Sequence, residues 1–302
     1  MKKIFTLLVM VALATCWVSC SDDDNDDNAN WQEIRATLEI TDPTKESSFY
    51  CYTSSTNITT CETIIDWGDG IIDENKNTHY YSQKGTYYVT IKVKKIKKLD
   101  SMSPMTSLDL SELTELTDLS LSLYSSSLNS LDLSNNIKLI TLSCGNSLIN
   151  SINLKSNTEL NELIVHHNYQ LTSLDLSNNT KLTRLTCYNN QLTSLDLSKN
   201  IELTSLDCSS NQLTSLDLSK NTELSSLSFS FNQLTSLDLN KNTKLKYLAC
   251  ENNPFTQETV NALLNSLPMG KYLYGEPQSI LYISYTLDAS IAEEKGWRVF
   301  KV

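Results

Sequence analysis

The sequence predicts a mainly β protein: a solenoid of stacked coils with parallel β ladders on both sides, preceded by a small β-sandwich and followed by an α/β cap. Three observations predict this fold class. Leucines recur every 21 residues between Leu182 and Leu245, short alternating segments precede them, and the pattern stops at Pro254. The expected divisions are a signal peptide at 1–19, a tether at 20–30, the sandwich at 31–98, the repeats at 99–253 and the cap at 254–302.

The first residues have the character of an export signal. Lys2 and Lys3 precede a short apolar run that ends at Ser19-Cys20. A basic start, a short apolar core and a small residue at the end are typical of a secretory signal peptide. The segment 17–20 resembles a bacterial lipobox, which implies that Cys20 becomes the lipidated first residue of the mature chain. The alternative is an ordinary cleaved signal with an incidental cysteine.

The segment after Cys20 reads SDDDNDDNAN. Such an acidic run has nothing to bury and is expected to be a solvated tether. It also resembles the signals that send some Gram-negative lipoproteins to the outer cell face. The resemblance implies an exported outer-membrane lipoprotein that faces the exterior and contacts the membrane through its lipid anchor only. A net charge of −11 argues against a nucleic-acid partner, and we expect a monomer.

The segment 31–98 alternates like a set of short strands. The expected strands are 34–40, 48–54, 63–66 and 86–95, separated by turn residues. The run Asp66-Trp67-Gly68-Asp69-Gly70, followed by His79-x-Tyr81 and Gly85-x-Tyr87-x-Val89, resembles the polycystic-kidney-disease (PKD) type of immunoglobulin-like domain. That resemblance implies a spacer or interaction module, with His79 packed and hydrogen-bonded rather than catalytic.

Two cysteines in this segment, Cys51 and Cys61, leave two alternatives open. An oxidising compartment would favour one disulfide between them. The other interpretation is a pair of buried thiols.

The repeats follow the pattern L-x-x-L-x-L-x-x-N-x-L, with cysteine in the third apolar position of several copies. This pattern is the leucine-rich repeat signature. The stretch LTSLDLSKN, at 192–200 and again at 213–221, is itself L-x-x-L-x-L-x-x-N, so each coil is expected to carry a second strand-like motif. The chain therefore resembles the short, nested subclass of bacterial leucine-rich repeats. The cysteine column indicates small buried hydrophobes rather than metal ligands or disulfides.

After Pro254 the periodicity changes. Apolar residues on one helical face predict a helix over 256–267. A strand at 279–284, a short helix at 287–295 and a final strand at 297–302 complete the expected cap.

Chemistry-bearing motifs do not emerge from the sequence. It contains no G-x-S-x-G, H-E-x-x-H, phosphate-binding loop or dinucleotide-binding turn, so we expect neither an enzyme nor a cofactor or metal. A column of aspartates, including Asp175, Asp196 and Asp217, is expected to form an exposed, salt-bridged face rather than a calcium ladder.

Recognition is expected on the variable half of each coil, where residues beside the inward leucines point outward. Aromatic, arginine and histidine side chains gather there, as is typical of binding surfaces. The candidate partner-binding residues are Glu162, Ile164, His166, His167, Arg184, Tyr188, Asp207, Phe231, Tyr247 and Glu251. The resemblance implies protein binding or adhesion to a host or microbial protein. The alternatives are a glycan-binding accessory protein and a structural spacer.

Overall fold

The computed structural model describes residues 31–52, 61–122, 127–270, 272–273, 276–277 and 279–302 of the 302-residue chain. The predicted signal peptide, the tether and Cys20 lie outside these residues. Residues 31–302 form one compact unit. Within the described part, none of the helices has the length and apolar character needed to cross a membrane.

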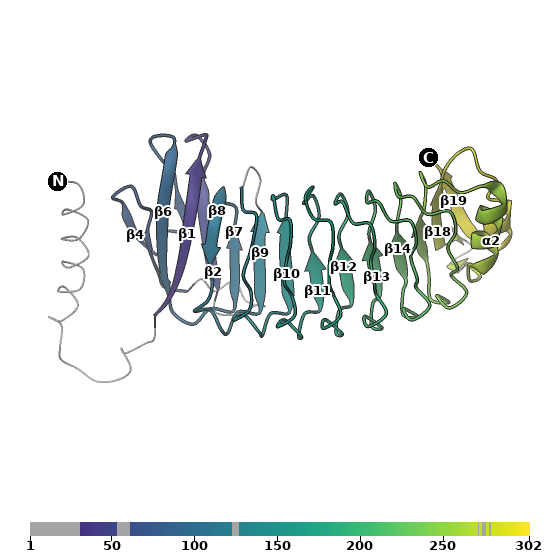
Figure 1. Cartoon of the computed structure of the whole chain (residues 1–302), viewed down its shortest axis with the longest axis horizontal. Helices are drawn as coiled ribbons and strands as arrows, with labels where there is room; N and C mark the ends of the chain where they lie inside the picture. Colours follow the sequence, from purple (N-terminus) through teal and green to yellow (C-terminus); the bar gives the residue numbers. More distant parts are fainter. Residues whose placement is uncertain (1–30, 53–60, 123–126, 271, 274–275, 278) are drawn as a thin grey trace. The chain divides into compact units, whose positions relative to one another are not determined.

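The strands form two large sheets and one small one (Figure 1). The five-stranded sheet has the order β4 (Ile72–Glu74), β3 (Thr63–Asp66), β6 (Gly85–Val93), β1 (Gln32–Ile40) and β8 (Met105–Asp109). The twelve-stranded sheet has the order β19 (Trp297–Lys301), β18 (Ser279–Ile283), β15 (Tyr247–Ala249), β14 (Ser226–Ser228), β13 (Ser205–Asp207), β12 (Arg184–Thr186), β11 (Glu162–Ile164), β10 (Thr141–Gly145), β9 (Asp118–Ser122), β7 (Lys98–Ser101), β2 (Ser47–Tyr52) and β5 (Thr78–His79). The small sheet pairs β16 (Tyr272–Leu273) with β17 (Glu276–Pro277).

The four strands expected in the N-terminal segment are present as β1, β2, β3 and β6. In β1, buried side chains alternate with more exposed ones because successive side chains point to opposite faces. The second layer of this region, formed by β2, β5 and β7, belongs to the twelve-stranded sheet, in which β7 pairs in parallel with β9. In the other direction β8, which follows residue 98, pairs with β1. The expected boundary at residue 98 thus falls within shared sheets, and one hydrophobic core extends from Ile34 to Trp297.

The coils stack as the repeat period predicts. Parallel strands β9 to β15 pair in register, so that their central leucines form one buried column: Leu119, Leu142, Leu163, Leu185, Leu206, Leu227 and Leu248. This confirms the solenoid of parallel strands. The cysteine column is also buried, with free thiols at Cys144, Cys187, Cys208 and Cys250. Burial raises the pKa of the Cys144 thiol to about 12.

The expectation of β ladders on both sides of the coils is wrong for the second side. The LTSLDLSKN halves bury their leucines but contain no strand among the described residues. The reason is that side chains take the backbone donors that a ladder would use. The Ser198 N–H donates to Asp196 Oδ1 at 2.9 Å, and the Leu192 N–H donates to Asn211 Oδ1 at 3.0 Å.

The aspartate column belongs to this turn chemistry. Each aspartate from Asp175 to Asp238 accepts the N–H of the residue two positions later, and the same bond occurs at Asp109 and Asp132. Along the column, the described residues contain one lysine–aspartate ion pair, Lys155 with Asp175 at 4.0 Å. The expected salt-bridged face is therefore mainly a face of hydrogen-bonded turns.

Two columns of asparagines run through the stack, and all of their members except the half-buried Asn253 are buried. Asn168, Asn190, Asn211, Asn232 and Asn253 lie just after the strands, and we name them the strand-side column. Asn136, Asn157, Asn179, Asn200, Asn221 and Asn242 end the other halves, and we name them the turn-side column. Members of both columns donate from Nδ2 to backbone carbonyls of their own or the preceding coil, and these bonds tie neighbouring coils together.

The C-terminal elements match the expected cap. Helix α2 (Gln257–Ser266) starts after Thr256, whose hydroxyl accepts the Thr259 N–H in a capping box. Helix α3 (Ser290–Glu294) is shorter than expected. Strands β18 and β19 extend the parallel ladder beyond β15, since Leu248 aligns with Leu281 and Leu281 with Val299.

Candidate functional site

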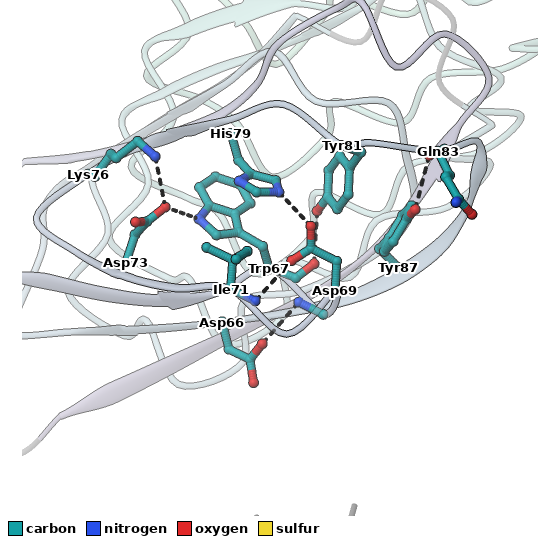
Figure 2. Close-up of polar contacts among 11 residues, drawn as sticks. Asp66, Trp67, Asp69, Ile71, Asp73, Lys76, His79, Tyr81, Gln83 and Tyr87 are labelled. Carbon is teal, nitrogen blue, oxygen red and sulfur yellow. Dashed lines mark hydrogen bonds and ion pairs between the residues drawn. The ribbon is translucent and has the colours of Figure 1, made fainter. Parts of the chain in front are cut away.

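The Trp-Gly-Asp-Gly segment of the N-terminal sheet builds a packed network (Figure 2). His79 Nε2 lies 2.8 Å from Asp69 Oδ2, and the His79 ring stacks on Trp67 with centroids 5.0 Å apart. The indole Nε1 donates to Asp73 Oδ2 at 3.0 Å, and the Tyr81 hydroxyl donates to the Trp67 carbonyl at 2.9 Å. His79 is buried between Asp69 and the Trp67 ring, so its role is structural, as the sequence predicts.

The cysteines of this region are neighbours. Cys51 and Cys61 are free, buried thiols, and the Cys61 N–H donates to the Cys51 carbonyl at 3.1 Å. A hydrogen bond from its side chain to Cys61, together with burial, raises the pKa of the Cys51 thiol. The two cysteines are therefore neighbours, and a disulfide between them stays a prediction.

The outward side of strands β9 to β15, β18 and β19 is the candidate site, which we name the ladder face. Along β11 to β14 the first and third residues point outward and the second points inward, as their burial shows. Parallel register places equivalent residues of successive coils side by side, about 4.8 Å apart. Residues that are 21 or 22 apart in sequence therefore become neighbours on one surface.

Five of the predicted residues meet at β11 and β12 or just beyond the ends of these strands. Glu162 aligns with Arg184, and their side chains form an ion pair. Ile164 lies beside Thr186 on the same face and is half-buried. His166 stacks on Tyr188 in the neighbouring coil, with centroids 4.8 Å apart and ring planes 17° from parallel.

His167 extends this contact into a group of four, the His–Tyr cluster: His166, His167, Tyr169 and Tyr188. The His167 ring meets the edges of both His166 and Tyr188, and its Nδ1 lies 2.7 Å from the Tyr169 hydroxyl. Tyr169 is 59% exposed and was missed by the sequence analysis, because it falls in a loop insertion where the repeat gives no register.

Gly145 makes room for the cluster. A Cβ atom at this position would lie 2.5 Å from the His166 ring, so any larger residue would displace the imidazole. Burial lowers the pKa of His166, and the adjacent His167 lowers it further. The His166 ring is therefore kept neutral and packed at neutral pH.

One position in each coil has a left-handed backbone. The residues there are Asn146, His167, Asn189, Ser210, Phe231 and Asn252, with φ between 53° and 57°. Asparagine and histidine tolerate this conformation, whereas a bulky residue such as phenylalanine is strained in it. His167 and Phe231, both predicted partner-binding residues, are the two aromatic residues among them, and Phe231 is 56% exposed. Strain retained at an exposed aromatic side chain is typical of functional positions.

A second aromatic group lies where the ladder enters the cap. Tyr247 packs on Tyr282 with centroids 5.8 Å apart, and Tyr282 stacks on Phe300 at 5.0 Å. The Arg298 guanidinium lies 5.0 Å from the centre of the Phe300 ring. Among these residues the sequence predicted only Tyr247, because the repeat pattern ends before β18 and gives no register for the others.

The remaining predicted residues occupy the coils between these groups or beside them. Asp207 lies at the third position of β13, and its Oδ1 accepts the Ser209 N–H at 3.0 Å. Glu251 follows β15 by two residues and has a buried carboxylate oxygen without a hydrogen-bond partner. Phe231 and His167 share the left-handed column but lie three coils apart, so they form no common cluster.

The described residues contain no group of three or more His, Cys, Asp or Glu side chains placed to hold a metal ion. A shallow hollow of about 260 Å³ lies on the turn side, lined by residues that include Asp196, Asp217 and Lys220. Its two aspartates already accept the N–H groups of Ser198 and Ser219.

Comparison with known proteins supports the fold. No protein family matches the chain, and no curated protein matches it in sequence. Among solved structures, the functional domain of InlJ from Listeria monocytogenes, described as including a cysteine ladder, is similar with a TM-score of 0.55 and 33% identity over 65% of this chain. A leucine-rich repeat protein of Leptospira interrogans is similar with 21% identity over 63% of this chain and a TM-score of 0.49. Internalin C2 of Listeria monocytogenes is similar with 18% identity over 57% and a TM-score of 0.47.

The chain spans 41% of the InlJ domain, 56% of the Leptospira protein and 78% of internalin C2. The fold is that of a bacterial leucine-rich repeat solenoid.

Proposed function

We propose that this chain is a non-enzymatic surface protein that binds another protein through the ladder face. The observation that carries the proposal is the His–Tyr cluster, which places two histidines and two tyrosines on a face otherwise rich in serine and threonine. Tyrosine is enriched at protein–protein contacts because it combines apolar area with a hydrogen-bonding hydroxyl. The similarity to the functional domain of InlJ supports the leucine-rich repeat fold on which this surface is built.

The ring geometry favours a protein over a glycan. Stacked rings such as His166 on Tyr188, and Tyr282 on Phe300, cover one another's faces. Each stacked ring has one face covered by its neighbour, whereas a sugar packs best on an open ring face.

The test is the double substitution Tyr188→Ala with Tyr247→Ala in the full chain. Binding to candidate host and microbial proteins should weaken while the circular-dichroism spectrum and the thermal midpoint stay near those of the parent. The matched control is Tyr80→Ala with Tyr88→Ala, which removes two exposed tyrosines from the N-terminal region. Capture that is unchanged by the ladder-face pair, or equally reduced by the control pair, would refute the proposed face.

We also propose that the protein is exported and lipidated at Cys20, on the outer surface of a Gram-negative cell. The lipobox-like segment and the acidic run after it support this proposal. Cys20→Ser should abolish incorporation of a labelled fatty acid and release the protein from the membrane fraction. Retention of Cys20→Ser in that fraction would contradict the anchor, and protease treatment of intact cells would test which side it faces.

A further inference from the structure

Between the two aromatic groups of the ladder face lie two coils with small outward side chains. We name these residues the serine strip: Ser205, Asp207 and Ser209 from one coil, and Ser226, Ser228 and Ser230 from the next. Tyr188 flanks the strip on the β12 side and Tyr247 on the β15 side. Three strand spacings, about 14 Å, separate these flanking strands. The strip is therefore a band of short side chains between longer ones.

Two buried polar atoms on adjacent coils of this region have no hydrogen-bond partner. They are Ser230 Oγ and Glu251 Oε2. The Phe231 N–H donates to the Glu251 carbonyl at 3.0 Å. Since Ser230 directly precedes Phe231, Ser230 and Glu251 lie on adjacent coils. Ser230 is 4% exposed, and strand alternation from Ser226 places it on the outward side. A buried acceptor without a donor is costly, so a ligand that donates hydrogen bonds here would be favoured.

The charge of this region is acidic and uncompensated. Within the described residues, no ion pair joins Asp207 or Glu251 to a basic side chain, and Arg184 beside the strip already pairs with Glu162. Burial raises the pKa of Tyr247, and Tyr282, Glu251 and Asp207 raise it further. Both carboxylates thus act on the same tyrosine hydroxyl from different coils.

A single metal ion does not fit this arrangement. The strands that carry Asp207 and precede Glu251 are two spacings, about 10 Å, apart, which is too far for both carboxylates to ligate one ion directly. Two basic side chains of one polypeptide segment fit better, because each carboxylate can then pair with its own cation and the serine oxygens accept further hydrogen bonds.

We propose that the serine strip receives basic side chains, lysine or arginine, from an exposed segment of the partner polypeptide. This inference rests on the proposed function of the ladder face and names the chemistry that the face selects. The basic side chains lie between the strands of Tyr188 and Tyr247, Asp207 and Glu251 each pair with one of them, and Ser230 accepts a hydrogen bond.

The test uses the immobilised full chain and a phage-displayed library of random short peptides. Selected peptides should be enriched in lysine and arginine, and the binding of a synthetic selected peptide should weaken as salt concentration rises. Asp207→Asn with Glu251→Gln should reduce its affinity about tenfold or more. Asp207→Asn keeps the acceptor for the Ser209 N–H, so the turn is preserved.

The matched control is Asp217→Asn with Asp238→Asn, which removes the same charge from the turn side and keeps the equivalent acceptors. This control should leave peptide affinity unchanged. Selected peptides without basic enrichment, or equal losses of affinity in both charge variants, would overturn the proposal that the serine strip binds basic side chains. The proposed function of the ladder face would still stand if Tyr188→Ala with Tyr247→Ala weakens partner binding. A face that selects no peptide and captures no protein would overturn both proposals.

Discussion

The two halves of each coil bury leucines equally well but satisfy their backbones differently. In the variable half, strands bond to neighbouring strands, so the backbone provides most of its own partners, and few outward side chains have a structural role; one that does is Asp207, which accepts the Ser209 N–H. In the LTSLDLSKN half, aspartate and asparagine side chains accept backbone N–H groups and replace the ladder. The repeated residues of the LTSLDLSKN half are thus structural. Sequence variation is tolerated in the other half, because its backbone groups bond mainly to neighbouring strands.

The asparagine columns provide the strongest way to test this comparison. Asn211 donates to three carbonyls and accepts the Leu192 N–H at 3.0 Å, whereas Asn200 donates to two carbonyls and its Oδ1 has no partner. Because unsatisfied buried groups cost about 1–3 kcal/mol each, we expect Asn211→Ala to destabilise by about 3–5 kcal/mol and Asn200→Ala by about 2–3 kcal/mol.

Urea denaturation followed by circular dichroism measures both asparagine variants. Asn240→Ala, at an exposed position, serves as the control and should stay within about 0.5 kcal/mol of the parent. Equal losses for Asn211→Ala and Asn200→Ala would show that the unpaired oxygen does not distinguish the two columns.

A smaller effect is expected at the left-handed column of the variable half. Phe231→Asn should raise the free energy of unfolding by about 1 kcal/mol, because asparagine adopts positive φ at lower cost. The same substitution should weaken partner binding. Phe231→Leu retains the Cβ constraint and should give no such gain, so a gain from leucine, or none from asparagine, would contradict the strain.

The smallest effect is a difference in pH response. Since the pKa of His166 is lowered in the folded state, the unfolded chain binds the proton more readily. Stability is therefore fully present above about pH 6.5, the ordinary histidine value, and declines as pH falls below it. The turn-side aspartates, whose pKa values are lowered mainly by hydrogen bonds to serine, respond only at more acidic pH.

Thermal midpoints measured between pH 7 and pH 5 test this difference, with His166→Gln as the variant. In that variant the thermal midpoint should fall less steeply between pH 7 and about pH 6 than in the parent. An unchanged slope would mean that His166 contributes nothing to it.

The sequence predicts the positions of residues inside the repeats correctly and does not predict those of residues outside the repeat pattern. The fixed period places Leu185, Leu206 and Leu227 in one column, and the same period correctly turns Arg184, Tyr188 and Asp207 outward. Periodicity cannot tell a ladder from a series of side-chain-capped turns, because both bury alternate leucines. It also cannot supply a register for Tyr169, in an insertion, or for Tyr282, beyond Pro254, although both complete aromatic groups on the face.

The identical copies at 192–200 and 213–221 have a consequence for how such a face could change over generations. Each coil contacts mainly its neighbours, so recombination between the copies can delete or add a whole coil without disturbing the rest. Deleting residues 192–212 would remove Asp207 and bring the Tyr188 and Tyr247 strands closer by about 4.8 Å, and duplicating them would widen the gap by the same step. The distance between the two aromatic groups of the ladder face can therefore change in steps of one coil, about 4.8 Å each.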